Sequence, residues 1–392
     1  MNTIHENGRR LAAVLAVIGW LGLAGGLLGI TGCAEEPVKP EAALDTPEHH
    51  YSTGLRLLDK NDQDGAMKEF QRAVALDPNF APGHAGIGLV YGFKGMYPEA
   101  YDAIKKAKKL QNEPMIVAQI MKIRVLSMER KEGWLEEAED EFKDGRKKDQ
   151  NNPALHFYMG KAYRVGLEFD KAAAHFKTVL DLNKDFVGEA DKEWQLVQKI
   201  QRAAPGTKIG KQIALIDKIS RADVAALFIE ELRIDRLFEK KGKTFDPSFK
   251  APGQKFEADK IVAMEPATDI ATHPLKADID TVVKLGVRGL EPSPDHKFEP
   301  SKSITKAEYA IMLEDIMIRI TGDEKMATQY FGQQSLFPDV RPDVYYFNAA
   351  MILSSRGILE ADKATGEFGA SQSITGADAL LAIRMFKESL KI

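Results

Sequence analysis

Cys33 is the only cysteine among the 392 residues, and its surroundings are those of a residue that is chemically modified. Two arginines precede an uncharged apolar run (11–30), and Thr31 and Gly32 lead from that run to the cysteine. A basic start, an apolar run and small residues before a cleavage point are typical of an export signal. A single thiol excludes an intrachain disulfide and a zinc site built from several cysteines. The chemistry that this pattern predicts is processing and attachment at Cys33.

The ending Ile30-Thr31-Gly32-Cys33 resembles the bacterial lipobox. In that family a lipid is attached to the cysteine and cleavage leaves it first, so the resemblance implies a signal peptide at 1–32 and lipidation at Cys33. An alternative stays open, because the twenty residues 11–30 could also span a bilayer as a retained helix. Both interpretations place the rest of the chain outside the cytoplasm, at a membrane. Ala34 stands where lipoproteins kept in the inner membrane have Asp, which implies the outer membrane, facing the periplasm.

The residues after the cysteine predict a tether followed by ordinary globular protein. Residues 33–46 contain Pro37 and Pro40 and show no hydrophobic period, which predicts a flexible or partly extended spacer of roughly 3 Å per residue. The whole chain has 44% hydrophobic and 29% charged residues, as globular domains do. Its formal net charge of -4 gives no general attraction to nucleic acid.

No constellation of residues predicts catalysis. The eight histidines show no metal-ligand spacing, and neither a Gly-x-Ser-x-Gly turn nor a phosphate-binding glycine loop is present. Acidic pairs such as Glu136-Glu137 fall on charged helix faces, where solvation explains them. We therefore expect a protein that is not an enzyme and that uses no metal and no cofactor.

A repeat of 34 residues appears in windows that begin at Pro47, Ala81 and Pro153. Shared positions carry glycine at 8 (Gly54, Gly88, Gly160), alanine at 20 (Ala66, Ala100, Ala172) and a large apolar residue at 24 (Phe70, Ile104, Phe176). Small residues let two antiparallel helices cross closely, and the large residue fills the gap beside them. The pattern resembles the tetratricopeptide repeat (TPR), and a longer unit at 115–152 keeps the second-helix residues. We predict a mainly α-helical protein with a four-pair solenoid over 47–186.

The TPR resemblance also implies a binding surface. In that family the concave face of the array binds a peptide or protein segment, and positions 5, 9 and 12 of each unit point there. The candidate peptide-groove residues are Tyr51, Leu55, Leu89, Phe157, Lys161 and Arg164. Apolar walls with a basic end are compatible with a peptide that carries an acid. The alternative that these side chains pack only on neighbouring repeat helices stays open.

A second repeat, with a period of seventy residues, follows a helix predicted at 189–203. Asp269, Phe298, Ile304 and Thr305 recur as Asp339, Phe368, Ile374 and Thr375, and a partial copy begins at Ile219. Each copy has Ser or Thr followed three residues later by Asp or Glu, which predicts a capping box at a helix start.

Two stretches of this repeat, Phe337-Pro338-Asp339-Val340 and the run from Phe298 to Glu308, resemble the S-layer homology (SLH) module. Over 187–392 the resemblance implies a helical bundle that binds cell-wall polysaccharide or peptidoglycan. The basic residue that follows the Ser or Thr implies glycan-binding candidates at Arg221 and Lys306, whereas the third copy has Gly376. The Trp expected early in each module is missing.

These patterns lead to two hypotheses for function. In the first, the protein is a lipoprotein of the cell envelope that tethers the membrane to a wall polymer or surface layer, while its TPR units bind a protein. In the second, it is a periplasmic assembly or scaffold lipoprotein that works through the TPR groove alone.

Overall fold

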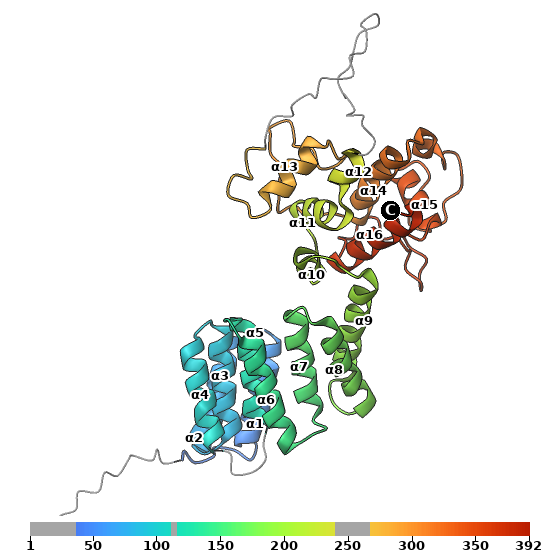
Figure 1. Cartoon of the computed structure of the whole chain (residues 1–392). Coiled ribbons are helices and arrows are strands. Elements are labelled where there is room, and N and C mark those ends of the chain that lie inside the picture. The colour runs from blue at the N-terminus through green and yellow to red at the C-terminus, as the bar shows by residue number, and fades with distance from the viewer. Residues whose placement is uncertain (1–36, 111–115, 240–266) are drawn as a thin grey trace, which may run out of the picture.

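The computed structural model describes residues 37–110, 116–239 and 267–392, all of them in helices, turns and loops (Figure 1). Cys33 and the predicted signal peptide lie outside these residues, as does most of the insertion at 242–268. Within the described ranges the structure contains two isolated β-bridges and no strand, so the prediction of a mainly α-helical protein is confirmed.

The first half is an array of four packed helix pairs. The helices are α1 (Pro47–Asp59), α2 (Gln63–Leu76), α3 (Ala81–Phe93), α4 (Tyr97–Leu110), α5 (Val117–Glu129), α6 (Trp134–Lys148), α7 (Pro153–Val165) and α8 (Phe169–Leu182). Side-chain caps begin several of them: Thr46 accepts a hydrogen bond from the His49 amide, and Asn152 from the Leu155 amide.

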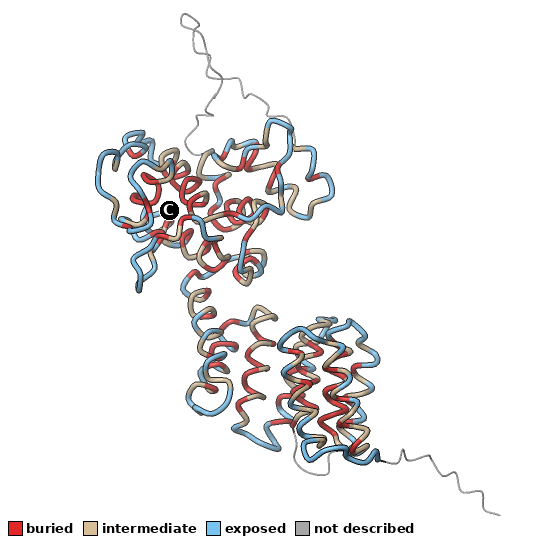
Figure 2. Tube along the Cα trace, turned by 180° about the vertical axis from the view of Figure 1, so that it is seen from behind, coloured by how far each residue is buried: buried red, intermediate tan, exposed pale blue. Residues whose placement is uncertain are grey.

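The glycines of the 34-residue repeat lie where the predicted helix crossings occur. A Cβ atom on Gly54 would stand 2.5 Å from the Phe70 ring, and one on Gly160 would stand 2.7 Å from the Phe176 ring. Both phenylalanines are fully buried. The small residue of one helix therefore receives the ring of the next, which is the packing that the sequence predicts. Figure 2 shows the buried residues following the helix–helix contacts of the array.

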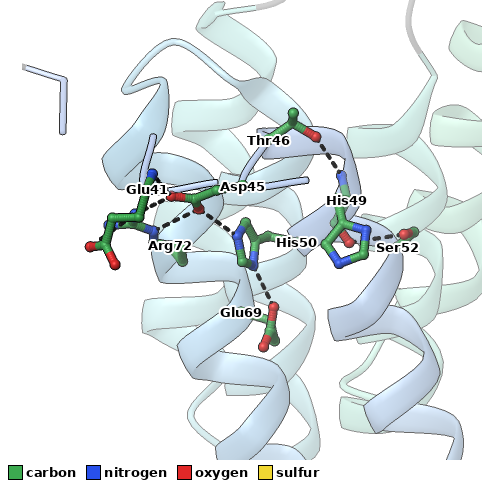
Figure 3. A network of polar contacts seen from close by, with 8 residues as sticks. All are labelled: Glu41, Asp45, Thr46, His49, His50, Ser52, Glu69 and Arg72. Carbon is green, nitrogen blue, oxygen red and sulfur yellow. Dashed lines mark hydrogen bonds and ion pairs between the residues drawn. The ribbon is translucent and has the colours of Figure 1, made fainter. Parts of the chain in front are cut away.

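The N-terminal segment is docked against the array instead of extending freely. The Val38 amide donates to the Ala75 carbonyl at the end of α2, and Asp45 forms an ion pair with Arg72 of the same helix (Figure 3). We call residues 38–46 the strap. Of the expected flexible or partly extended spacer, flexibility is wrong for the strap, because backbone and charged groups of α2 hold it.

A ninth helix, α9 (Val187–Ala203), joins the array to the second half. It packs on α8 and also on α16 (Gly376–Leu390), the last helix of the chain. Lys199 of α9 forms an ion pair with Asp378 of α16 at 2.7 Å. The predicted cap on the array is thus also the link to the second half.

The second half is a helical bundle. Its elements are α10 (Lys208–Ile213), α11 (Arg221–Leu227), a π-helical turn η1 (Phe228–Leu232), α12 (Ile234–Glu239), α13 (Lys276–Lys284), α14 (Lys306–Thr321), a 3₁₀ turn η2 (Glu324–Thr328), α15 (Phe347–Ser355) and α16. The seventy-residue period is visible in its backbone: three isoleucines, one from each copy, form a closed ring of hydrogen bonds. The Ile219 amide donates to Ile374, that of Ile374 to Ile304, and that of Ile304 to Ile219, at 3.0–3.2 Å. The three copies therefore meet around a local three-fold axis.

The capping boxes predicted in each copy are present in two. Ser220 with Asp223 and Thr305 with Glu308 form complete boxes at the starts of α11 and α14. At the start of α16 the Thr375 hydroxyl accepts from the Asp378 amide, but no bond from Asp378 back to the Thr375 amide is present. The Asp378 carboxylate accepts from the Thr375 hydroxyl at 2.7 Å and pairs with Lys199 through its other oxygen, so the third box lacks the bond to the Thr375 amide.

Among the described residues, no helix combines the length and the apolar character needed to span a bilayer.

Candidate functional site: the inner face of the helical array

First helices of three pairs bring cations and aromatic rings to a common face. We call this set the inner face: Tyr51 of α1, Arg124 of α5, and Tyr158, Lys161 and Arg164 of α7. The charge of Arg124 and the hydroxyl of Tyr158 both act on the Tyr51 hydroxyl. Helices that are distant in sequence therefore direct polar groups to one space.

The aromatic rings at and beneath the inner face are held by contacts with other rings. The Tyr51 ring lies 5.8 Å from Phe70 and 6.1 Å from Phe80, between ring centroids, and burial raises the pKa of its hydroxyl. At the other end of the array, Phe157 stacks on Phe186 with a centroid distance of 4.9 Å. Aromatic side chains that are held by neighbours lose little entropy on binding a partner.

The cations lie over these rings. The Arg124 guanidinium is 4.4 Å from the centroid of Tyr158, and the Lys161 ammonium is 5.5 Å from that of Phe157. Burial lowers the pKa of Lys161 against the opposing effect of Glu193, and Arg164 and Arg124 lower it further. Cations partly removed from water and close to one another favour an anionic group as their next partner.

Arg164 meets Glu193 of α9 at 3.0 Å, and each side chain is about one-fifth exposed. The two facing atoms, Nε of Arg164 and Oε2 of Glu193, are buried and make no hydrogen bond within the described part of the chain. A charged pair with unsatisfied polar atoms is costly in a protein interior. The pair therefore leaves one donor and one acceptor unsatisfied beneath the surface.

The structure divides the predicted peptide contacts into two groups. Tyr51, Leu55, Lys161 and Arg164 are partly exposed, whereas Leu89 is fully buried and Phe157 is only 5% exposed. The prediction that Leu89 is a peptide contact is therefore corrected, since this side chain packs in the core of the first two pairs. Phe157 acts from beneath the surface, as the platform for Lys161.

Sequence reasoning missed Arg124 and Tyr158. Arg124 lies in the irregular third unit, where the repeat has no glycine to fix the register, so positions 5, 9 and 12 could not be assigned. The start of α5 at Val117 shows that Arg124 occupies position 8, where the other units have glycine. Tyr158 stands next to Phe157, at a position that the family pattern does not direct to the groove.

In the bundle, the two predicted glycan residues occupy equivalent positions. Arg221 lies 4.7 Å from the Phe298 ring and donates to the carbonyls of Gly289, Glu291 and Phe298. Lys306 lies 4.6 Å from the Phe368 ring and donates to the Glu360 carbonyl. Each of the two cations therefore holds the loop of the next copy, and Arg221 uses all three of its nitrogens to do so.

Carboxylates surround both cations. Those that act on Arg221 belong to Glu299, Glu291, Glu308 and Asp269, and those that act on Lys306 belong to Asp378, Asp339, Asp362 and Glu360. Burial lowers the pKa of both cations, in opposition to these acids. The surroundings of each cation are therefore acidic, which opposes the binding of an anionic sugar.

The third position, Gly376, has no room for a side chain. A Cβ atom there would stand 1.7 Å from the carbonyl oxygen of Ile213, the last residue of α10, and the Gly376 amide donates to Ile216. In the first copy α10 takes the place of the longer loops that Arg221 and Lys306 contact. The missing basic residue in the third copy follows from this close backbone approach.

No group of three or more His, Cys, Asp or Glu side chains within the described ranges has an arrangement that could hold a metal ion. A shallow surface pocket contains His156 and His175, whose Nδ1 atoms are 3.3 Å apart.

Comparison with known proteins supports the repeat. A family model described as TPR repeat matches residues 54–95, which include the end of α1 and all of α2 and α3. No curated protein matches the chain significantly. The matched segment and the consecutive packed helix pairs together identify a TPR-type region, and TPR-type regions generally bind other proteins.

Proposed function

We propose that the protein is a non-catalytic scaffold of the bacterial cell envelope that is anchored at its N-terminal side and captures an acidic segment of another protein on the inner face. The observation that carries the proposal is the pair of half-buried cations, Arg124 and Lys161, lying on the rings of Tyr158 and Phe157. A preorganised guanidinium on an aromatic ring binds carboxylates with little further loss of side-chain entropy.

The anchoring part of the proposal rests on sequence. The apolar run before Cys33 and the lipobox-like ending support lipidation at Cys33 and a position at the outer membrane. Either lipidation or a retained helix leaves the array outside the cytoplasm, where the captured protein must also be.

A selection experiment tests capture. The full-length protein, solubilised in detergent, is used to select from a displayed library of random 12-residue peptides. We expect the selected peptides to be enriched in Asp and Glu and to be lost when Arg124→Ala and Lys161→Ala are combined. Selection of no peptide, or an equal selection by the double variant, would contradict the proposal.

A second candidate function is binding of wall polymer by the bundle. The local three-fold arrangement supports it, as does Lys306, for which one hydrogen-bond acceptor is present in the described part of the chain. An ammonium has three N–H donors. The surrounding carboxylates favour a neutral sugar, whose hydroxyl groups donate to them.

Cosedimentation of the full-length protein with purified sacculi tests this candidate. Retention that Lys306→Ala abolishes supports wall binding, whereas retention that it leaves unchanged places binding elsewhere. Without retention, the inner face remains as the working surface.

A further inference from the structure

We infer that the array rests on an anionic membrane surface through the basic edge formed by the C-terminal ends of α4 and α6. This inference rests on the anchoring in the proposed function and adds to it the orientation of the protein and the chemistry of the surface that it contacts. The argument depends on where the strap joins the array and on how charge is distributed between the two edges.

The strap fixes the edge at which the chain enters. Val38 is bonded to Ala75, near the C-terminal end of α2, and the strap lies at the lower edge of the array in Figure 1. Connected helices of the array alternate in direction, so the C-terminal ends of α2, α4, α6 and α8 share this edge. The chain that leads from the membrane thus arrives beside the ends of these second helices.

The remaining tether is short. Five peptide steps separate Cys33 from Val38, so the distance between them cannot exceed about 17 Å. Lipidation at Cys33 and a membrane helix that ends near residue 30 both put Cys33 close to the headgroups. The edge of the array that carries the strap is therefore held within a few Debye lengths of the bilayer.

Charge is distributed unequally between the two edges. The first turns of the second helices are acidic, with Asp64, Glu99, Glu136, Glu137 and Asp170. The last turns are basic in α4 (Lys108 and Lys109) and in α6 (Arg146, Lys147 and Lys148). The last turns of α2 and α8 hold no basic residue, so the basic part of the membrane-proximal edge is the part that α4 and α6 form.

Exposed lysines in the last turn of α4 and in the turn before it are not used within the described part of the protein. Lys105, Lys106 and Lys109 of α4 are exposed and form no ion pair with the described residues. Lys108, by contrast, forms an ion pair with the buried Glu141, which joins the last turn of α4 to the middle of α6. Complementing the helix dipole explains a charge in the last turn but not three exposed lysines beside it. An anionic lipid surface attracts each such residue by roughly 1 kcal/mol, or about fivefold in partition.

Lysine acetylation, read by mass spectrometry, tests the inference on the full-length protein reconstituted into vesicles. We compare vesicles of neutral phosphatidylcholine with vesicles that contain phosphatidylglycerol. Lys106 is the reporter and Lys131, in the loop between α5 and α6 at the opposite edge, is the internal control. We expect acetylation of Lys106 to fall about fivefold on the anionic vesicles, to recover in high salt, and to leave Lys131 unchanged.

Two double variants complete the test. Lys105→Glu with Lys109→Glu should abolish the protection of Lys106. Lys60→Glu with Arg130→Glu changes the net charge equally at the other edge, leaves the Lys131 control in place and should keep the protection. Equal protection on both vesicle types, or protection by soluble polyglutamate but not by vesicles, would overturn the inference. Flotation is measured separately: failure to float with either vesicle overturns the anchoring as well, whereas flotation without protection overturns only the membrane contact.

Discussion

The Nδ1 atom of His50 lies 2.6 Å from a carboxylate oxygen of Glu69 and thereby joins the first helix of the array to the second. Its Nε2 atom lies 2.8 Å from Asp45 of the strap (Figure 3). Both ring nitrogens face carboxylates, so the charged imidazolium can donate to both. His50 therefore connects the strap, α1 and α2 in one network.

In the fourth helix pair, the histidine equivalent to His50 faces a second histidine instead of a carboxylate. His156, like His50, is the fourth residue of its repeat window, and His175 corresponds to Glu69. The Nε2 atom of His156 contacts the Gln150 carbonyl, just as that of His84 contacts the Pro78 carbonyl in the second pair. A histidine at position 4 thus ties the start of a helix pair to the segment before it.

Opposite pH responses are expected at these two equivalent places. Burial opposes protonation of His50, but Glu69 and Asp45 outweigh it and raise the pKa of His50 above 6.5. The stabilisation of the fold by the charged His50 is therefore complete below pH 6.5 and is lost as the pH rises through the raised pKa. Burial lowers the pKa of His156 and lowers that of His175 to about 4. Acid below pH 6.5 therefore destabilises the fourth pair. The hydrogen-exchange protection factors, which are corrected for the pH dependence of intrinsic exchange, should be lower in α1 and α2 at pH 8 than at pH 6. Those of α7 and α8 should be lower at pH 4.5 than at pH 6.

Replacing His50 tests the strap network directly. His50→Gln should lower the free energy of unfolding of the first pair by about 0.5–1 kcal/mol near pH 6, because solvent screens these partly exposed ion pairs. It should also speed hydrogen exchange in the strap. His49→Gln is the matched control, since the His49 side chain is exposed and pairs with neither Asp45 nor Glu69, while its ring lies 5.6 Å from that of His50. Equal effects of the two substitutions would contradict the assigned role.

Gly376 is expected to tolerate no side chain. Gly376→Ala would place a Cβ atom 1.7 Å from the Ile213 carbonyl and should destabilise the bundle by about 2–3 kcal/mol. The matched control is Gly188→Ala in α9, where a Cβ atom would have no neighbour within 4 Å and where helix propensity predicts a gain of about 0.5–1 kcal/mol. Urea denaturation gives both values. A neutral Gly376→Ala would mean that α10 does not close the third position.

The repeat predicts equal roles for Asp269 and Asp339. The Asp269 carboxylate accepts from the amides of Phe298 and Glu299, and that of Asp339 from those of Phe368 and Gly369, all at 2.8 Å. Asp269→Asn and Asp339→Asn should each cost about 1–2 kcal/mol, because an amide side chain can accept only one of the two bonds. Chemical denaturation of the two variants measures this cost. Unequal costs would show that the two loops are not equivalent.

Acid should loosen the loop that Asp269 holds. Burial opposes ionisation of Asp269, but the two backbone amides outweigh it and hold its pKa below 3.8. The stabilisation is therefore present above pH 3.8 and is lost as the pH falls through the lowered value.

Sequence predicted the helix pairs well because the glycine at position 8 and the large residue at position 24 contact each other within one window. The contact of Gly54 with Phe70 is local in this sense, and so is the capping box of Ser220 with Asp223. Contacts between residues at fixed positions of one repeat window can be predicted from the repeat pattern itself.

Contacts outside a repeat window could not be predicted in this way. The strap has no hydrophobic period, and its docking depends on Arg72, 27 residues after Asp45. The lack of space for a side chain at residue 376 is caused by a backbone carbonyl of α10. In the sequence, the glycine at 376 is the only sign of this contact. Arg124 was missed because its unit departs from the period.

The most direct test of the account is the affinity of an acidic peptide for the inner face, measured by fluorescence anisotropy with the full-length protein. The probe is the most enriched peptide from the selection described above. Arg124→Ala should weaken binding about tenfold or more, as expected when a carboxylate loses a charge-assisted partner. Arg146→Ala, which removes an arginine lying over Phe142, is the matched control and should leave the affinity unchanged. Equal affinity of the Arg124→Ala variant and the unmodified protein would contradict binding at the inner face.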